Sequence, residues 1–521
     1  MNKKQVIIIG AGPAGITAGC EILKQSDEYQ VTMIEEEGQV GGISKTVCWN
    51  GNRMDLGGHR FFTKNDRVMN WWKELLPVQG EPSMDDKVLD RPCSLEENGP
   101  DPEKEDAVFL KRNRVSRIYY NHAFFDYPVK MNMTTIKNLG FAVTAEAGLS
   151  YLKSVIFKRK EKSLEDFYIN RFGKTLYRLF FEDYTEKLWG RHPRDISPDW
   201  GAQRVKGLSL LAVLKDIFGK RFLGTKHTVE TSLIESFYYP KYGPGQLWEA
   251  AAAQFEQMGG RILTGCRVEK IKMRDEKTIE EVIYDKDGQK TAVKADIVMS
   301  TMPVKDLAAG MEYVTPKIRQ ITEGLPYRDY VTVGILVDKL KIKNTTTIKT
   351  FGEMIPDCWI YVQDRGVRLG RIQIFNNWSP YMVKQPQDTV WIGLEYFCAE
   401  GDEMWSMTGE EWSSFGRKEL IKIGVLDAET EILDTHCEKV KKAYPAYFDT
   451  YKEMNQVQNW INSVDNLYCI GRNGQHRYNN MDHSMLTAFE AVKAMLSGSA
   501  DKSAIWEVNT EKEYHEEKKG D

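Results

Sequence analysis

Short apolar runs separated by glycine-rich turns recur along this chain of 521 residues. The first run, at residues 6–9, leads into glycines and then into a helical pattern, and a second run at 31–34 follows. Apolar runs of this length, with turn residues at both ends, are typical of strands buried inside an α/β sheet. Similar segments lie at 261–275, 294–304 and 466–470, so we expect one sheet built from distant parts of the chain.

Two other patterns fill the regions between these segments. In residues 132–235 apolar positions recur every three or four residues, as in SLEDFYINRFGKTLYRLFFEDYTEKLW, which predicts helices. Residues 325–400 contain runs such as YVTVGILVD, CWIYVQD, GRIQIFNNW and VWIGLEYF, which predict an antiparallel sheet. A helical lobe and a sheet lobe are therefore expected beside the α/β domain.

The turn after the first apolar run has the spacing of a dinucleotide-binding site. Gly10 permits a sharp strand-to-helix turn, Gly12 lets the backbone approach a pyrophosphate, and Gly15 lets the helix pack closely on the sheet. The helix N-terminus offers free N–H groups and the positive end of its dipole to the anion. Glu35 follows the second run, where a carboxylate accepts hydrogen bonds from ribose hydroxyls.

NAD and FAD both bind at glycine turns of this kind, and two further glycine pairs in this chain favour FAD. Gly41 and Gly42 come shortly after the second run, and Gly57 with Gly58 directly precedes His59. Backbone without side chains at both places suits a cofactor that continues past its pyrophosphate into a flat ring system, so we predict FAD. The sequence contains no second glycine turn that would indicate a separate NAD(P)H-binding domain. NAD(P)H remains a candidate reductant that acts directly at the flavin.

The expected fold class is α/β, with a Rossmann-like FAD-binding domain of glutathione-reductase type, a helical lobe and an antiparallel β-sheet substrate lobe. Val268 lies in a later strand that we expect to reach the cofactor. The predicted boundaries are 1–75, 236–310 and 455–500 for the FAD-binding domain, 132–235 for the helical lobe, 76–131 and 311–454 for the sheet lobe, and 501–521 for a tail.

Composition narrows the class of protein. The net charge of −4 gives no overall basic surface for nucleic acid or an anionic membrane, so local arginines would have to hold an anionic substrate. The eight cysteines are scattered without CxxC spacing, which indicates reduced thiols in a cytoplasmic protein and no metal site. No stretch reaches the roughly eighteen apolar residues of a membrane span, although peripheral contact with a membrane stays open. The sequence does not fix the oligomeric state.

Seven motifs occur in a definite order: DLGGHRFF, RIYYNHAFFDYPVKMN, EDYTEKLWG, DWGAQRV, YPKYGPGQLWEA, CWIYVQD with GRIQIFNNWSPY, and GRNGQHRYNNMDHS. Across most of the chain this series resembles flavin-dependent UDP-galactopyranose mutases, within the wider group that includes amine oxidases and protoporphyrinogen oxidase. The resemblance implies an isomerase in surface polysaccharide biosynthesis. In that family N5 of reduced FAD attacks the anomeric carbon of a nucleotide sugar, UDP leaves, and the sugar ring closes on a different hydroxyl before UDP returns.

The resemblance also implies roles for individual residues. Arg371 and Arg472 would clamp the diphosphate, because guanidinium groups fit phosphate oxygens, and His59 would orient or polarise the reduced flavin. These three are the catalytic candidates. The substrate-binding candidates are Tyr127, Phe180, Trp189, Arg204, Trp378, Tyr444 and Tyr478. The cofactor-binding candidates are Gly10, Gly12, Gly15, Glu35, Gly41, Gly42, Gly57, Gly58, His59, Val268, Gly471, Arg472, Asp482 and Ser484.

Each candidate also has an ordinary structural interpretation. The two clamp arginines could form structural salt bridges, and a tryptophan is often a core residue. Asp482 and Ser484 could simply cap the last long helix. Such interpretations compete with a ligand-binding role at every position named above.

The chain departs from the mutase motifs at a few positions. Val129 and Lys130 stand where the mutases have phenylalanine and glutamine, Thr185 replaces an asparagine, and Trp378 replaces a tyrosine. These positions lie mainly on the nucleotide side, so another glycosyl diphosphate or a lipid-linked sugar is an alternative substrate. A different class of function also competes, an FAD-dependent oxidoreductase of the amine oxidase or protoporphyrinogen oxidase type. Arginines facing the flavin would favour the mutase, and an aromatic cage without arginines would favour the oxidoreductase.

Overall fold

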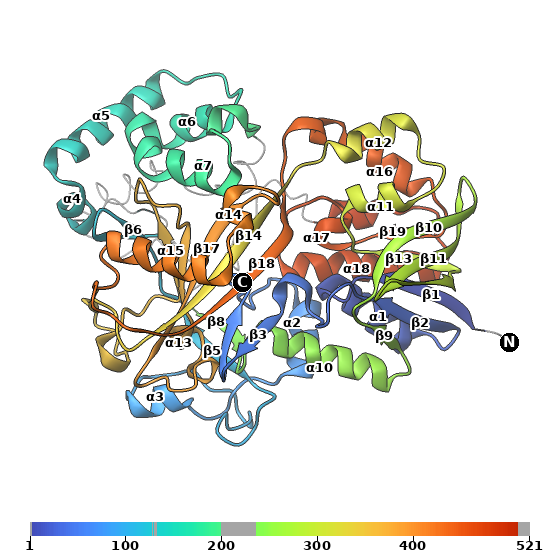
Figure 1. Ribbon diagram of the computed structural model, residues 1–521, viewed down its shortest axis with the longest axis horizontal. Coiled ribbons are helices and arrows are strands. Elements are labelled where there is room, and N and C mark those ends of the chain that lie inside the picture. Colours follow the sequence, from blue (N-terminus) through green and yellow to red (C-terminus); the bar gives the residue numbers. More distant parts are fainter. Residues whose placement is uncertain (1–2, 128, 130–132, 199–235, 509–521) are drawn as a thin grey trace, which may run out of the picture.

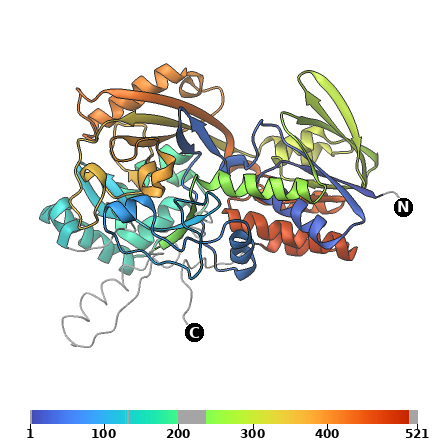
Figure 2. The ribbon, with the colours of Figure 1, turned by 90° about the horizontal axis from the view of Figure 1, so that it is seen from below.

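The computed structural model describes residues 3–127, 129, 133–198 and 236–508. Two halves lie side by side in both views: one contains a parallel sheet, and the other contains a larger mixed sheet with helices beside it (Figure 1 and Figure 2). Buried apolar side chains form one large cluster in the first half and three smaller clusters in the second. The predicted α/β fold class is confirmed, while the exact domain boundaries stay a prediction.

The parallel sheet has the strand order β19–β13–β1–β2–β9. In this sheet Val6 is level with Val31 on one side and with Ile297 on the other, and the apolar run at 6–9 is buried. Distant segments therefore meet in one sheet, as the apolar runs predicted. The strands are β1 (Lys4–Ile9), β2 (Tyr29–Ile34), β9 (Arg261–Leu263), β13 (Ile297–Ser300) and β19 (Leu467–Cys469).

Helix α1 (Pro13–Gln25) packs against α10 (Pro244–Gln257) and α18 (Met481–Ser497). A close approach between α1 and the turn before it sets the position of the helix: a Cβ on Gly15 would lie 2.0 Å from the carbonyl oxygen of Gly10. An antiparallel sheet adds Ile271, Ile279 and Val282 to the same core. Its strands are β10 (Arg267–Asp275), β11 (Thr278–Lys286) and β12 (Gln289–Lys294).

The larger sheet has the order β18–β14–β17–β16–β15–β6–β7 and is antiparallel except between β15 and β6. A long connection between the two strands permits this parallel pair, so the lobe predicted as an antiparallel sheet is a mixed one. The strands are β6 (Ser116–Tyr120), β7 (Ala123–Asp126), β14 (Tyr327–Val337), β15 (Trp359–Val362), β16 (Arg371–Ile374), β17 (Val390–Cys398) and β18 (Ile432–Pro445).

The predicted strand GRIQIFNNW is wrong in its second half. Strand β16 ends at Ile374, and the short helix α13 (Phe375–Trp378) follows. The side-chain amide of Asn376 donates to the carbonyl of Thr389, and that of Asn377 donates to the carbonyl of Asp357. These bonds to neighbouring segments replace the strand ladder, as asparagine side chains often do.

The predicted helical lobe is present in the described part of residues 132–235. Gly173, at φ +79°, kinks the third helix, and a π-helical turn at Arg178–Glu182 leads into the fourth. Buried aromatic side chains such as Phe167 and Phe172 pack these helices against the larger sheet. The helices are α4 (Met133–Leu139), α5 (Phe141–Ile156), α6 (Leu164–Tyr177) and α7 (Asp183–Trp189). Arg204 lies outside the described residues.

Shorter elements connect these layers. Among the described residues, no helix combines the length and apolarity that crossing a bilayer requires. The connecting elements are β3 (Thr46–Trp49), β4 (Asn52–Asp55), α2 (Asp66–Leu75), α3 (Met84–Val88), β5 (Phe109–Asn113), β8 (Ser236–Pro240), α11 (Val304–Gly310), α12 (Pro316–Glu323), α14 (Glu403–Ser406), α15 (Gly409–Lys422), α16 (Met454–Asn462) and α17 (Gly471–Gly474).

The fold continues past residue 500, where the sequence predicted a tail. Helix α19 (Ser503–Glu507) buries Ile505 and Trp506 against the core of the parallel sheet. The buried ammonium of Lys502 donates hydrogen bonds to the carbonyls of Val464 (2.6 Å) and Leu467 (2.8 Å). These contacts hold residues 502–507 in place.

Lys502 should make stability depend on pH at alkaline values. Burial lowers the pKa of its ammonium from 10.5 to about 8, so between these values the unfolded chain binds a proton that the folded chain lacks. The free energy of unfolding of the protein, relative to Lys502→Met, should therefore rise by roughly 3 kcal/mol from pH 8 to 10.5. Urea titrations of both proteins across this range test it, and a difference that stays flat with pH would contradict it.

Candidate active site

A cavity of about 430 Å³ lies where the two halves meet. Its wall combines the turn before α1, residues 56–60 and the start of α18 with side chains from β15, β16 and β18 of the larger sheet. The predicted site residues that it brings together are Gly12, Gly42, Gly57, Gly58, His59, Tyr127, Arg371, Tyr444, Gly471, Arg472, Tyr478, Asp482 and Ser484.

The glycine turn presents bare backbone to this cavity. A Cβ on Gly12 would touch only Gly42, at 3.8 Å, so a side chain there would project into open space. Gly10 has φ +95°, and a Cβ on it would meet the Thr301 hydroxyl. The next residues, Pro13 and Ala14, begin α1 at the cavity wall. The free N–H groups of this first turn therefore face a space where an anion can bind.

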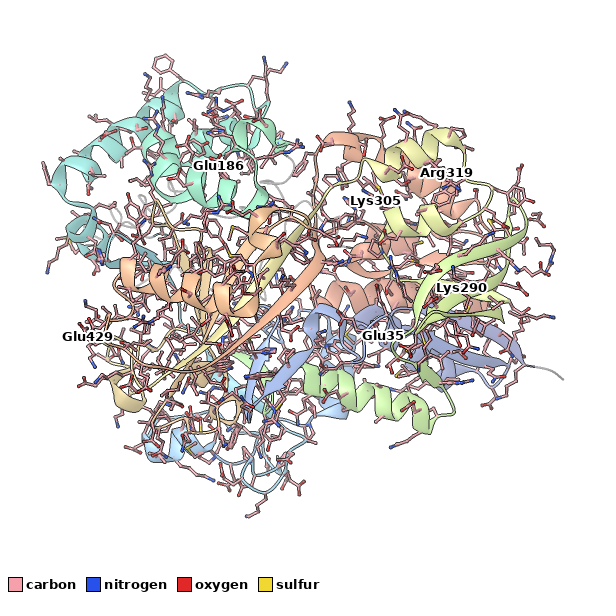
Figure 3. All side chains as sticks on the ribbon, in the orientation of Figure 1. Glu35, Glu186, Lys290, Lys305, Arg319 and Glu429 are labelled. Atoms are coloured by element: carbon pink, nitrogen blue, oxygen red, sulfur yellow. The ribbon has the colours of Figure 1, made fainter. Side chains whose placement is uncertain are left out.

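Glu35 lies beside the same turn, at the end of β2 (Figure 3). Its carboxylate accepts hydrogen bonds from the backbone N–H groups of Ala11 (2.7 Å) and Glu37 (2.9 Å). Burial raises the pKa of this carboxyl group, and the two backbone hydrogen bonds oppose that rise. Glu35 is thus fixed close to the turn, although it does not line the cavity itself.

The two later glycine pairs are close-packed for different reasons. Gly41, at φ +104°, donates a backbone hydrogen bond to the carbonyl of Ala11 (2.8 Å), which ties the first pair to the glycine turn. A Cβ on Gly58 would overlap the indole ring of Trp359, with a separation of 2.0 Å. Gly57, at φ +115°, carries the chain past this ring to His59. A side chain at Gly58 would not fit, and its absence lets the strand β15 approach the cavity closely.

His59 is a neutral imidazole in this cavity. Burial, and then the charge of Arg472, lower the pKa of the ring to about 3. Its Nδ1 atom is buried and makes no hydrogen bond within the described residues. The side chain can therefore exchange hydrogen bonds with a ligand at neutral pH, but it cannot supply a positive charge.

Arg371 is held in a buried network on the larger sheet. Its Nη1 atom donates to Glu395 (3.0 Å) and Tyr444 (3.2 Å), and its Nε atom donates to the hydroxyl of Tyr184 (2.7 Å). Glu395 is fully buried and also accepts from Gln373 (3.0 Å). The guanidinium is thus ion-paired and fixed, as in the structural interpretation, yet it also lines the cavity, as the ligand-binding interpretation requires.

Arg472 is fixed without a carboxylate. Its guanidinium donates to the carbonyls of Ala443 (3.0 Å) and Asn479 (2.7 Å), and it lies 4.6 Å from the ring centroid of Tyr478. No ion pair of Arg472 is found in the described part of the chain. Its charge is therefore uncompensated by a neighbouring acid and contributes a positive field to the cavity.

Aromatic rings form two further parts of the wall. Tyr361 stacks between Tyr127 (4.4 Å between centroids) and Trp359 (5.8 Å). Tyr444 stacks on Tyr478 at 5.9 Å with an interplanar angle of 6°. The first stack suits a planar base. In the second, the hydroxyl of Tyr444 accepts from Arg371, and the guanidinium of Arg472 lies over the ring of Tyr478.

The N-terminal turn of α18 closes the cavity on the side of the parallel sheet. Asp482, His483 and Ser484 line it, and the hydroxyl of Ser484 donates to the side chain of Asn479 (3.0 Å). Gly471 lies between the two helices, because its N–H donates to Thr487 (2.9 Å) and a Cβ on it would lie 2.9 Å from Ala14. Two helix N-termini, of α1 and α18, therefore face one cavity.

Gly10, Gly15, Glu35 and Gly41 support the glycine turn without lining the cavity, and four further predicted residues lie away from it. Trp378 is fully buried, and its indole N–H donates to the carbonyl of Cys358 (2.8 Å), so it is a core residue. Phe180 packs on Phe125 in the helical core, and Val268 packs against the core of the first half. Trp189 lies behind Tyr444, edge-on to its ring at 6.4 Å. Phe180 and Trp189 can support the wall but do not form it.

Sequence reasoning missed several residues that line the cavity. Arg60 follows His59 directly, and Arg114 comes from the loop before β6, so four arginines share this wall. Trp359 and Tyr361 alternate along the strand CWIYVQD, and this spacing places both on one face. The alternation was present in the sequence and could have identified them.

The residues of the cavity fit a flavin dinucleotide. Gly12 and Gly42 leave a backbone cradle that side chains would fill, and two helix N-termini supply N–H groups for a pyrophosphate. Buried polar atoms at the wall, Nδ1 of His59 and Oδ1 of Asp482, accept no hydrogen bond from the described residues. These features together are expected of a site built around a polar ring system.

Comparison with known proteins agrees with this geometry. Residues 13–471 match the profile of the flavin-containing amine oxidoreductase family. A probable UDP-galactopyranose mutase from Klebsiella pneumoniae is 25% identical over 251 residues, which is 45% of this chain and 53% of that protein. A coproporphyrinogen III oxidase from Mycobacterium leprae (strain TN) is 28% identical over 69 residues, 13% of this chain and 15% of that protein. The matched part thus spans about half the length of the first relative and less of the second.

The fold also matches that of a solved structure over nearly its whole length. The crystal structure of a reduced UDP-galactopyranose mutase aligns with 98% of this chain and 100% of its own, with a TM-score of 0.74. Sequence identity in this alignment is 20%, so the likeness concerns the fold.

Replacing Gly12 should remove the flavin without unfolding the protein. A valine side chain at this position meets little protein and occupies the cradle, so Gly12→Val should purify colourless with a melting temperature near that of the flavin-free parent. Absorbance at the flavin bands and thermal unfolding measure the two effects. Gly38→Val is the matched control, because nothing lies within 4 Å of a Cβ there. A yellow Gly12→Val protein would show that the cradle is misassigned.

His59 should stay neutral from about pH 5 to 8, unlike an ordinary histidine. Because its pKa is lowered to about 3, its ring resonances should not shift across this range. NMR spectra of the protein and of His59→Gln identify the signal, and added free imidazole serves as an internal pH reference. A titration centred near 6.5 would contradict the burial and charge effects described above.

Proposed function

The chain belongs to the flavin-containing amine oxidoreductase family, and on this basis we propose that it is an FAD-dependent mutase acting on a sugar diphosphate, of the UDP-galactopyranose mutase type. The reaction would be a redox-neutral isomerisation in the cytoplasm that supplies a sugar for surface polysaccharide synthesis. The observation that carries the proposal is the placement of Arg371 and Arg472 in the same cavity as the glycine turn.

Positive charge in this cavity favours an anionic ligand beyond the cofactor. Arg60 and Arg114 line it together with the two clamp arginines, while the nearby buried carboxylates are Asp482 in the wall and Glu395, which pairs with Arg371. A diphosphate that leaves a sugar and later returns needs cationic groups that stay in position throughout. Arg472 meets this need, since backbone carbonyls rather than a mobile acid hold its guanidinium.

The chain's own residues would orient and stabilise the reactants. When bound in reduced form, the flavin would supply N5 as the nucleophile at the anomeric carbon. The neutral ring of His59 would donate or accept a hydrogen bond at the cofactor, and the hydroxyls of Tyr444 and Tyr478 would donate to phosphate oxygens. Their mutual stacking fixes both hydroxyls before the ligand arrives, which lowers the entropic cost of binding.

Tyr127 is our candidate for stacking on the nucleotide base. It is partly exposed at the cavity wall and continues the stack of Tyr361 and Trp359. Phe180 cannot share this role from its buried position beneath the sheet. A flat aromatic ring can stack on any nucleotide base, so the ring does not identify the nucleotide. The ligand screen below distinguishes between nucleotides and the lipid-linked alternative.

An FAD-dependent oxidoreductase is the second candidate function. The stacked aromatic wall of Trp359, Tyr361 and Tyr127 is the observation that favours it, because an aromatic cage beside the flavin is the arrangement expected of that class. The four arginines at the same wall favour the mutase instead. NAD(P)H would in either case serve as the candidate electron donor for the flavin.

Removing either clamp arginine should weaken binding of UDP-galactose while FAD stays bound. We expect Kd to rise by about 30-fold, which corresponds to roughly 2 kcal/mol for a charged hydrogen-bonding group. The variants are Arg472→Ala and the double variant Arg371→Ala with Glu395→Gln. The double variant avoids a buried carboxylate without a partner, which would itself repel the ligand. Calorimetry measures Kd, and the flavin spectrum reports cofactor content.

Matched controls separate the clamp from general effects of losing an arginine. The guanidinium of Arg319, at the outer edge of the molecule in Figure 3, also donates to carbonyls, so Arg319→Ala is the control for Arg472→Ala. Arg117→Ala with Asp357→Asn removes another buried ion pair of the same sheet. If the clamp variants bind UDP-galactose as tightly as these controls, the assignment is wrong.

The reaction itself is tested under anaerobic conditions. Protein reduced with dithionite is mixed with UDP-galactopyranose and a panel of other sugar nucleotides, and isomerised products are separated by chromatography. Product that forms only with reduced flavin and without net consumption of electrons supports the mutase. No product from any sugar diphosphate, together with flavin turnover when amines or porphyrinogens are supplied in air, assigns the protein to the oxidoreductases.

A further inference from the structure

Large apolar side chains are exposed together on one part of the surface. Outside this region the exposed large apolar residues of the described chain are scattered. Within residues 133–157 six of them are between 55% and 86% exposed, which is far more than single surface residues account for. They are Met133, Phe141, Leu149, Leu152, Ile156 and Phe157, and we call them the apolar face.

Helix α5 aligns most of this face along one side. At about 100° per residue, five positions fall within roughly 80° of one another around the helix axis. These positions are Phe141, Ala145, Leu149, Leu152 and Ile156. The opposite side of the helix, with Ala147, Tyr151 and Ser154, is buried and packs toward α6. The helix therefore has an apolar side in the core and a second one that no described residue covers.

Basic residues are frequent in the segment that carries this apolar face. Residues 133–162 contain six lysines and arginines and two glutamates, in a chain whose total net charge is −4. Glu161 already accepts from Arg171 (2.7 Å), and Arg159 pairs with Asp166 (3.5 Å). Lys158, Lys160 and Lys162, just beyond α5, form no ion pair in the parts of the chain that the structure describes.

We propose that α4, α5 and the basic segment after them bind an anionic phospholipid surface. Apolar side chains on one face of a helix with lysines at its border are the combination that holds a helix in the plane of a membrane interface. Helix α5 has 16 residues, too few to span a bilayer. A second copy of the chain fits this face less well, because its lysines would meet these lysines.

The position of the face would bring the cavity to the membrane. Helices α4 and α5 lie at the outer edge of the half with the larger sheet, away from the parallel sheet (Figure 1). The side chain of Asn138 in α4 donates to the carbonyl of Phe124 in β7 (2.9 Å), which ties α4 to that sheet. Tyr127, at the cavity wall, comes six residues before α4. Docking would thus place one wall of the cavity near a lipid surface.

Vesicle binding by the full chain tests this proposal. The protein is sedimented with vesicles of phosphatidylcholine alone and of phosphatidylcholine with phosphatidylglycerol, at low and high salt. We expect binding to the anionic vesicles that weakens with salt, and about a ten-fold loss in Leu149→Glu with Leu152→Glu. Val88→Glu with Leu433→Glu, at exposed apolar residues elsewhere, is the matched control and should bind like the parent.

Several results would overturn the proposal. Absence of binding to anionic vesicles, or equal binding by the parent and by the α5 variant, contradicts it directly. A parent dimer that becomes monomeric in the α5 variant, without vesicle binding, would show that the face contacts another protein chain. Vesicle binding is measured without turnover, so its outcome is independent of the proposed function.

Discussion

A turn with glycine at three positions, Gly10, Gly12 and Gly15, determines where everything else in the site can lie. Gly15 approaches the carbonyl of Gly10 so closely that a Cβ would lie 2.0 Å from it, and this contact fixes the start of α1. Gly41 is hydrogen-bonded back to the same turn, and Gly471 brings α18 against α1. Because no side chain intervenes, two helix N-termini and the arginines of the larger sheet can face one cavity. A flavin and an anionic ligand would then share that space.

The two clamp arginines are not neutralised equally, and this difference suits a cavity that holds both a cofactor and an anionic ligand. Glu395 neutralises Arg371 and holds it in place, whereas Arg472 keeps its charge because carbonyls hold it. Burial, together with the field of Arg472, lowers the pKa of His59 and keeps it neutral, so the histidine can contact a cofactor without repelling or attracting charge. Glu395 thus positions Arg371, while Arg472 supplies an uncompensated positive charge, and together they attract a bound diphosphate.

The fold class could be predicted from sequence because apolar runs and glycine spacing are local signals. The parallel pairing of β15 with β6 could not, since strand partners far apart in the chain leave no local mark. Motif resemblance located Arg371 and Arg472 at the cavity, but it also included Trp378, whose partners are the carbonyl and rings of its own core. Arg60 was missed because its place at the cavity depends on how the two halves meet, whereas the alternation of Trp359 and Tyr361 in one strand could have identified that pair.

If a flavin and an anionic ligand share this cavity, binding of the ligand must perturb the flavin. The most informative measurement is a titration of the oxidised protein with UDP, followed by the flavin absorbance spectrum and by calorimetry in parallel. We expect a saturable change in the flavin bands with the same Kd as the heat of binding. UDP that binds without perturbing the flavin spectrum, or that does not bind at all, would rule out a shared cavity.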